Sequence, residues 1–137
     1  MTEDKEELIL ANKLESVDRA ATAATEFARR ASFGDEALFA IDMAVREAVA
    51  NAVKHGNRMD ETKTVEITFR SLPEALEINV RDFGAGFDVE EVPDPTNPEN
   101  LLKANGRGVL FMRTFMEEVE WLRAESGGMI VRMRKLR

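Results

Sequence analysis

DEALFAIDMAVREAVANAVKHGN, residues 35–57, predicts one long helix around which the rest of the chain is arranged. Apolar residues recur at the three- and four-residue spacing of a buried helical stripe, at Leu38, Ile41, Val45, Ala48, Val49 and Ala52. Neither Gly nor Pro interrupts the run before Gly56, which we expect to end the helix. A second apolar set predicts that the helix is covered around most of its circumference; its members are Phe39, Met43, Ala50 and Val53.

Three polar residues on this predicted helix, Glu47, Asn51 and His55, fall four residues apart. Each four-residue step turns the side chain only about 40° around the helix axis, so the three should form one polar line. On an otherwise apolar helix such a line could hold a base and a metal ligand facing a cavity. The alternative is a solvent-facing ladder of side-chain hydrogen bonds, which would stabilise the helix by about 0.2–0.5 kcal/mol per pair.

The composition limits the classes of function. The 137 residues fit one domain, and the net charge of −7 argues against a general nucleic-acid binder or a protein that binds anionic membranes. Without cysteine there is no disulfide, thiolate zinc site or cysteine nucleophile, and a single histidine cannot build a histidine metal cluster. The sequence shows no signal peptide and no membrane-spanning run, so we expect a cytoplasmic protein with a protein or small-molecule partner.

The remaining periodicities predict a sheet and a second helix. Residues 8–10 could form an edge strand, and Ser16 can cap a helix with an alanine-rich face that Gly34 ends. Apolar and polar residues alternate over residues 65–70 and 76–81, and again on either side of a Gly-Gly turn near the C-terminus. Two hairpins and two helices predict an α/β two-layer sandwich, in which a mixed or antiparallel sheet is covered on one face by helices.

The segment between the two hairpins is irregular and contains glycines, so we expect function there. It begins at Asp82, directly at the end of a predicted strand, and Gly84 and Gly86 follow. Glycines separated by one residue let the backbone approach a ligand closely, and an acid at the strand end can accept a hydrogen bond from that ligand. The alternative is an ordinary Asp/Gly turn. The motif is not a dinucleotide fingerprint, because the third glycine and a following helix are missing.

Gly106, Arg107 and Gly108 lead directly into another apolar segment that reads as a helix. Free backbone N–H groups at a helix N-terminus, the positive end of its dipole and a guanidinium together suit a phosphate. The alternative is a glycine-rich linker with a solvated arginine. The chain has no G-x-x-x-x-G-K-[ST] motif, so a nucleotide would not be held by a P-loop, and the protein-kinase signature motifs are absent as well.

Taken in order, these motifs resemble the N, G1 and G2 boxes of the GHKL (Bergerat-fold) ATPases: E-x-x-x-N at Glu47 and Asn51, D-x-G-x-G at residues 82–86, and G-R-G at residues 106–108. Residues 93–118 further resemble the bacterial anti-sigma-factor serine kinases, the RsbW-like single-domain members of that superfamily. The resemblance implies the Bergerat ATP-binding fold, with residues 1–137 as a single GHKL-type ATP-binding kinase domain.

The resemblance also implies roles for individual residues. Asp82 would accept a hydrogen bond from the adenine amino group, while Gly84 and Gly86 would let the base and ribose lie close. Asn51 would hold Mg²⁺ through its side-chain oxygen, and Glu47 would orient and deprotonate the attacking hydroxyl. These roles agree with the preference of Mg²⁺ for oxygen ligands and with phosphoryl transfer by positioning and charge neutralisation.

The G-R-G motif is implied to meet the phosphates of ATP. Arg107 and the backbone amides around Gly106 and Gly108 would contact the β and γ phosphates. Lys54 and His55 lie near the polar line, and the resemblance assigns them no definite role. The implied cofactors are therefore ATP and Mg²⁺.

Two functions from different classes follow from the resemblance. The first is an anti-sigma factor that sequesters a sigma factor and phosphorylates a serine or threonine of a STAS-domain anti-anti-sigma protein, its antagonist. The second is a regulatory module that binds ATP and its partner without phosphotransfer. Glu47 favours the first, since a pure binder has no use for a base there. A histidine-kinase fragment fits less well, because the only histidine, His55, belongs to the nucleotide helix.

Oligomeric state stays open in the sequence. Members of the resembled family form dimers, and the exposed strand at residues 8–10 could be part of a homodimer surface. A monomer is the alternative. The negative charge gives no reason to expect direct binding of nucleic acid or a membrane.

Overall fold

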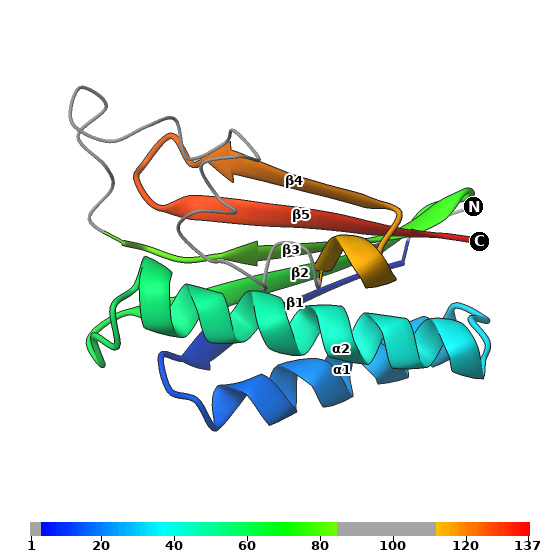
Figure 1. Ribbon diagram of the computed structural model, residues 1–137, viewed down its shortest axis with the longest axis horizontal. Helices are drawn as coiled ribbons and strands as arrows, with labels where there is room; N and C mark the ends of the chain where they lie inside the picture. Colours follow the sequence, from blue (N-terminus) through cyan, green and yellow to red (C-terminus); the bar gives the residue numbers. More distant parts are fainter. Residues whose placement is uncertain (1–3, 85–111) are drawn as a thin grey trace.

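A computed structural model describes residues 4–84 and 112–137 of the chain. In chain order their elements are β1 (Asp4–Ala11), α1 (Ser16–Arg30), α2 (Asp35–Asn51), the π-helix η1 (Ala52–Gly56), β2 (Thr64–Ser71), β3 (Ala75–Arg81), β4 (Glu118–Arg123) and β5 (Met129–Leu136). The strands form one antiparallel sheet in the order β1-β2-β3-β5-β4. Figure 1 shows α1 and α2 side by side on one face of this sheet, which confirms the predicted α/β two-layer sandwich.

Both predicted hairpins are present. A short turn joins β2 to β3, and the Gly-Gly turn joins β4 to β5. The predicted edge strand at residues 8–10 is part of the longer β1, which pairs with β2 along its whole length. β3 is consequently the middle strand of the sheet, and the residues that follow it leave the sheet next to the start of β5, where the backbone N–H of Asp82 donates to the carbonyl oxygen of Met129 (3.0 Å).

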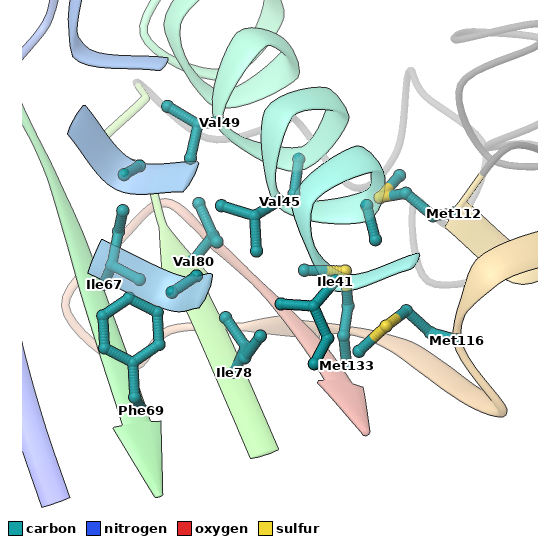
Figure 2. Close-up of a cluster of buried hydrophobic side chains, with 14 of the residues drawn as sticks. Ile41, Val45, Val49, Ile67, Phe69, Ile78, Val80, Met112, Met116 and Met133 are labelled. Atoms are coloured by element: carbon teal, nitrogen blue, oxygen red, sulfur yellow. The ribbon is translucent and has the colours of Figure 1, made fainter. Parts of the chain in front are cut away.

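The predicted apolar stripe of α2 packs on the sheet, and all six of its residues are buried. Figure 2 shows its side chains meeting those of β2 and β3, and the labelled residues of this contact are Ile41, Val45, Val49, Ile67, Phe69, Ile78 and Val80. Met112, Met116 and Met133 close the cluster on one side (Figure 2). Each such side chain contributes about 1.5–3 kcal/mol by leaving water, so this contact fixes the position of α2 over the sheet.

The second apolar set on α2 is only partly covered. Val53 is buried, Met43 and Ala50 are half-buried, and Phe39 is 57% exposed. The ring of Phe39 makes a T-shaped contact with the Phe115 ring, with the ring centroids 5.8 Å apart. The prediction that α2 is covered around most of its circumference is therefore wrong on this side, because apolar residues alone do not show that a second layer exists to bury them.

The predicted ends of α1 also need correction. Glu15 occupies the N-cap position, and Ser16 is the first helical residue, its hydroxyl donating to the carbonyl oxygen of Ala11 (2.7 Å). The helix ends at Arg30, before the predicted stop at Gly34, and Ser32, with φ of 72°, makes a left-handed turn after it. Gly34 instead precedes α2 with an extended backbone. None of the helices within residues 4–84 and 112–137 is long and apolar enough to cross a membrane.

Glu77 holds β3 between its neighbours on the face of the sheet that the helices leave open. Its carboxylate is almost fully buried and accepts hydrogen bonds from Arg70 of β2 (3.1 Å) and Arg134 of β5 (2.9 Å and 3.1 Å). Burial acts to raise the pKa of Glu77, but the hydrogen bonds from Arg134 and Asn79 lower it below the ordinary value. β3, whose last residue directly precedes Asp82, is therefore fixed from both sides.

Candidate functional site

The structure brings the end of the α2–η1 helix into contact with the residue that follows β3. Gly56 ends η1, and a Cβ atom placed on it would lie 2.2 Å from Oδ2 of Asp82. Asn51 is the last residue of α2 and directly precedes η1, and Glu47 lies one turn earlier. The predicted polar helix and the predicted acid at the strand end are therefore parts of one corner of the molecule.

Asp82 is held by backbone groups. Its side chain is mostly buried, with the residue 8% exposed, and Oδ1 accepts hydrogen bonds from the N–H groups of Gly84 (3.0 Å) and Met129 (3.3 Å). Within residues 4–84 and 112–137, Oδ2 accepts no hydrogen bond. Burial raises the pKa of Asp82, and the two backbone N–H groups oppose this only in part. The carboxylate thus has one oxygen fixed by the fold and one oxygen that can accept a hydrogen bond from a ligand.

Three glycines make room for Asp82 and the turn after it. A Cβ atom on Gly84 would lie 2.3 Å from the carbonyl oxygen of Gly56, and one on Gly128 would lie 2.1 Å from that of Asp82. Gly84 therefore packs against protein backbone. This contact alone requires a glycine at position 84, whether or not a ligand lies nearby. Gly56 does not take the left-handed conformation of a helix stop; Arg58 and Met59 do, with φ of 51° and 61°. Gly56 is needed because Asp82 lies against it.

The structure also shows a functional candidate that sequence reasoning missed. Oδ1 of the buried Asn57 accepts a hydrogen bond from the backbone N–H of Phe83 (2.7 Å), directly after Asp82. Asn57 was the last residue of the predicted helix, and an asparagine next to a glycine reads as an ordinary helix end. No signal in a single sequence connects it to a residue 26 positions later.

Only part of the predicted polar line is present. Glu47 and Asn51 are both half-buried and lie one turn apart on α2, as predicted. From Ala52 the chain forms a π-helix, closed by the bond from the N–H of Asn57 to the carbonyl oxygen of Ala52 (2.7 Å). The wider turn changes the rotation per residue, so His55 does not continue the line at the α-helical step, and it is exposed.

Asn51 carries an unpaired buried atom. Its Nδ2 is buried and has no hydrogen-bond partner in the part of the chain that the structure describes. Leaving a buried polar group without a partner costs about 1–3 kcal/mol, and such groups are few in native proteins. Nδ2 of Asn51 is therefore suited to donate to a group that residues 4–84 and 112–137 do not supply.

The side-chain oxygens of Glu47 and Asn51 fit Mg²⁺ that is bound together with a ligand. No group of three or more His, Cys, Asp or Glu side chains that could hold a metal exists within the described ranges 4–84 and 112–137. Asn51 and Glu47 offer oxygen atoms, which Mg²⁺ prefers, and Mg²⁺ is usually held by one or two protein groups with waters and substrate phosphates completing its shell. Glu47 and Asn51 alone do not supply all the ligands of a metal ion.

The remaining predicted site residues, Gly86, Gly106, Arg107 and Gly108, lie outside the described residues. The segment that follows them is anchored, because Met112 and Met116 are buried in the core below α2. Nζ of Lys135 also donates to the carbonyl oxygen of Phe115 (3.2 Å), which ties this segment to β5.

Comparisons with known proteins each cover most of the chain. The family model described as "Histidine kinase-like ATPase domain" matches residues 10–135. The chain is 29% identical over 123 residues to "Serine-protein kinase RsbW" of Listeria innocua serovar 6a, which covers 85% of the chain and 78% of that protein. It is 36% identical over 104 residues to "Anti-sigma F factor" of Clostridium perfringens strain SM101, which covers 73% of each.

Proposed function

Because the chain belongs to the histidine kinase-like ATPase domain family, in its RsbW-like group, we propose that it is an anti-sigma factor with ATP-dependent serine/threonine kinase activity. In this proposal it sequesters a sigma factor in the cytoplasm and phosphorylates a STAS-domain anti-anti-sigma protein. The names of the similar proteins support the kinase and the sigma-factor partner. The phosphate acceptor is proposed from the resemblance in the sequence motifs.

The observation that carries the proposal is the corner formed by Asp82 and the α2–η1 helix. None of the described residues donates a hydrogen bond to Oδ2 of Asp82, and a buried acceptor selects a ligand that presents a donor. The exocyclic amino group of adenine is such a donor, whereas guanine would present its carbonyl oxygen at that position. ATP is therefore the nucleotide that this corner supports best.

The phosphates are proposed to lie toward Asn51, which directly precedes η1, and Glu47, one helical turn earlier. Asn51 would hold Mg²⁺, which when bound neutralises charge on the phosphates, and Arg107 with the amides near Gly106 and Gly108 would contact their oxygens. Glu47 would accept the proton of the attacking serine or threonine hydroxyl. The oxygen of that hydroxyl would bond to the γ phosphorus while the bond between the γ phosphorus and the β-γ bridging oxygen breaks. The products are ADP and the phosphorylated partner.

The test is a single-turnover phosphotransfer assay beside a nucleotide titration. The partner protein is first obtained by co-purification and used as the acceptor. Glu47→Gln keeps the shape of the side chain and removes the base, so we expect phosphotransfer to slow by at least about 10²-fold, with ATP binding within a few-fold of wild type and sigma-factor capture retained.

A matched control is available on the same helix. Glu36→Gln makes the same chemical change at an exposed position in the first turn of α2, about 16 Å from Glu47 along the helix axis, and we expect normal phosphotransfer. If wild type transfers no phosphate to any co-purifying partner, the chain is better described as an ATP-dependent binding module. If Glu47→Gln transfers phosphate at the normal rate, Glu47 is not the base.

A further inference from the structure

Asn57 uses its whole side-chain amide to join four segments of the chain. Oδ1 accepts from the N–H of Phe83 (2.7 Å), while Nδ2 donates to Oδ1 of Asn12 (3.0 Å) and to the carbonyl oxygen of Thr64 (2.9 Å). Asn12 in turn donates from its Nδ2 to the carbonyl oxygen of Asp60 (2.9 Å). The network therefore links the end of β1, the end of η1, the start of β2 and the turn after β3.

The network is buried and satisfied. Asn12 and Asn57 are each 1% exposed, and both donors and one acceptor of the Asn57 amide are used. A fully satisfied buried network is rigid, because breaking any of its bonds leaves a polar group without water or a partner.

The backbone next to Asn57 is held in a strained conformation. Arg58 and Met59 are consecutive non-glycine residues with positive φ, a conformation that costs roughly 1–2 kcal/mol per residue. Backbone bonds from the N–H of Met59 to the carbonyl oxygen of Val53 (2.8 Å) and from that of Asp60 to Asn57 (3.0 Å) hold it in place. Strain of this kind persists where the surrounding structure determines it, and it is concentrated at functional sites.

We propose that Asn57 is a positioning residue that sets the base-binding end of the nucleotide site relative to its phosphate-binding end. The inference rests on the proposed function, in which Asp82 meets adenine and Asn51 meets Mg²⁺ and phosphate. Asn57 directly follows the continuous helix that carries Asn51, and its side chain fixes the residue directly after Asp82. Among the described residues, Asn57 is a side chain whose hydrogen bond joins the base-binding end to the helix of the phosphate-binding end.

This role has a consequence that a purely structural role lacks. A ligand that contacts both ends at once depends on their relative placement, since small misplacements weaken every contact of a bound ligand. Losing the bond to Phe83 should therefore weaken ATP binding, whereas losing another bond of the same network should lower the stability of the fold without changing ATP binding.

Asn12 provides the matched control. Asn57→Ala removes the bond to Phe83, and we expect ATP to bind about tenfold more weakly. Asn12→Ala leaves Asn57 bonded to Phe83 and Thr64, so we expect ATP affinity within about twofold of wild type although the buried amide is lost. Isothermal titration with Mg²⁺·ATP and urea unfolding of the three proteins measure the two effects separately.

A second variant keeps the proposal testable if Asn57→Ala does not fold. Asn57→Asp retains an oxygen that can accept from Phe83 while removing the amide donors, so we expect ATP affinity within about threefold of wild type. Amide hydrogen exchange at Phe83 should stay slow in wild type, Asn57→Asp and Asn12→Ala, and should be at least about tenfold faster in Asn57→Ala.

The outcomes separate the two proposals. Normal ATP affinity in Asn57→Ala, or equal losses of affinity in Asn57→Ala and Asn12→Ala, would overturn the positioning role while leaving the proposed function intact. For Asn57→Asp, a loss of affinity of tenfold or more in a folded protein that still protects the Phe83 amide would also overturn it. Failure of wild type to bind ATP would overturn the proposed function, and the role of Asn57 with it.

Discussion

The Asp82 corner and the Glu47–Asn51 face of α2 belong to one candidate site, but they are built in opposite ways. At the corner, Asp82 is bonded to backbone amides, packed against Gly56 and held by the Asn57 network. On the helix face, Glu47 is half-buried and Asn51 has a buried amide nitrogen without a partner among the described residues. The described residues already hold the Asp82 carboxylate in place, whereas they leave the helix face open to added groups.

This difference follows from what each end would bind. Adenine is rigid and uncharged, so a preformed acceptor recognises it with little reorganisation. Phosphates, Mg²⁺ and an incoming hydroxyl bring their own charges and hydration, and they complete a shell that the protein leaves open. Changes at the corner should therefore reduce nucleotide affinity by moving or altering the acceptor for adenine, and changes on the helix face should act through the metal ion and the phosphates.

The largest expected effect comes from filling the space at the corner. In Gly56→Ala the new methyl group would lie 2.2 Å from Oδ2 of Asp82, so the Asp82 side chain must move. We expect ATP affinity to fall by at least about 100-fold, which is the upper range for losing a hydrogen bond to a charged group. Gly34→Ala is the control, because a Cβ atom on Gly34 would have no neighbour within 4 Å. Isothermal titration measures both, and normal affinity in Gly56→Ala would show that the corner is not preformed.

The second prediction concerns the charge of Asp82. Asp82→Asn should weaken ATP roughly 10- to 100-fold, yet it should not lower the free energy of unfolding at pH 7. Burial raises the pKa of Asp82 in the folded protein above its value in the unfolded chain. The protonated carboxyl therefore adds to the free energy of unfolding below the unfolded-state pKa, and this contribution is lost as pH rises through the folded-state pKa.

Urea unfolding as a function of pH tests the sign of this effect. As pH rises from the ordinary aspartate pKa through the raised pKa of Asp82, the free energy of unfolding of wild type should fall relative to that of Asp82→Asn. The variant has no carboxyl group at this position to titrate. A relative rise over that window would mean that the Gly84 and Met129 amides outweigh burial, and that the ionised carboxylate stabilises the fold.

The smallest expected effect is on the helix face. Asn51→Ala should weaken Mg²⁺·ATP about tenfold by removing one ligand, while the affinity for ATP without Mg²⁺ changes little. Because Nδ2 of Asn51 makes no hydrogen bond to the described residues, stability should stay within about 0.5 kcal/mol of wild type or rise. A clear loss of stability would indicate that this face is as preformed as the corner.

The elements were predictable from the sequence because their signals are local. Helical periodicity gave the buried stripe of α2, and strict alternation gave both hairpins, since each face of these elements meets one environment. The four-residue spacing of Glu47 and Asn51 placed them one turn apart for the same reason. The π-helix at residues 52–56 was not predictable, because no local pattern distinguishes its hydrogen bonds from those of an α-helix.

The corner was only partly predictable, because its contacts join segments far apart in the chain. Asp82 stood out as an acid at a strand end, but the role of Asn57 depends on Phe83 and Asn12. Gly56 and Gly128 looked like a helix stop and a turn residue, and both are required by their contact with Asp82. Such requirements arise from tertiary packing, which propensities and spacing do not contain.

The measurement that tests the central claim most directly is a paired titration of wild type with ATP and GTP in the presence of Mg²⁺, repeated with Asp82→Asn. If Oδ2 of Asp82 accepts the adenine amino group, wild type binds ATP at least about tenfold more tightly than GTP, the effect of replacing a donor by an acceptor at one hydrogen bond. Asp82→Asn should lose most of this preference. Equal affinities of wild type for the two nucleotides, or an unchanged preference in Asp82→Asn, would contradict the assignment of this corner to adenine.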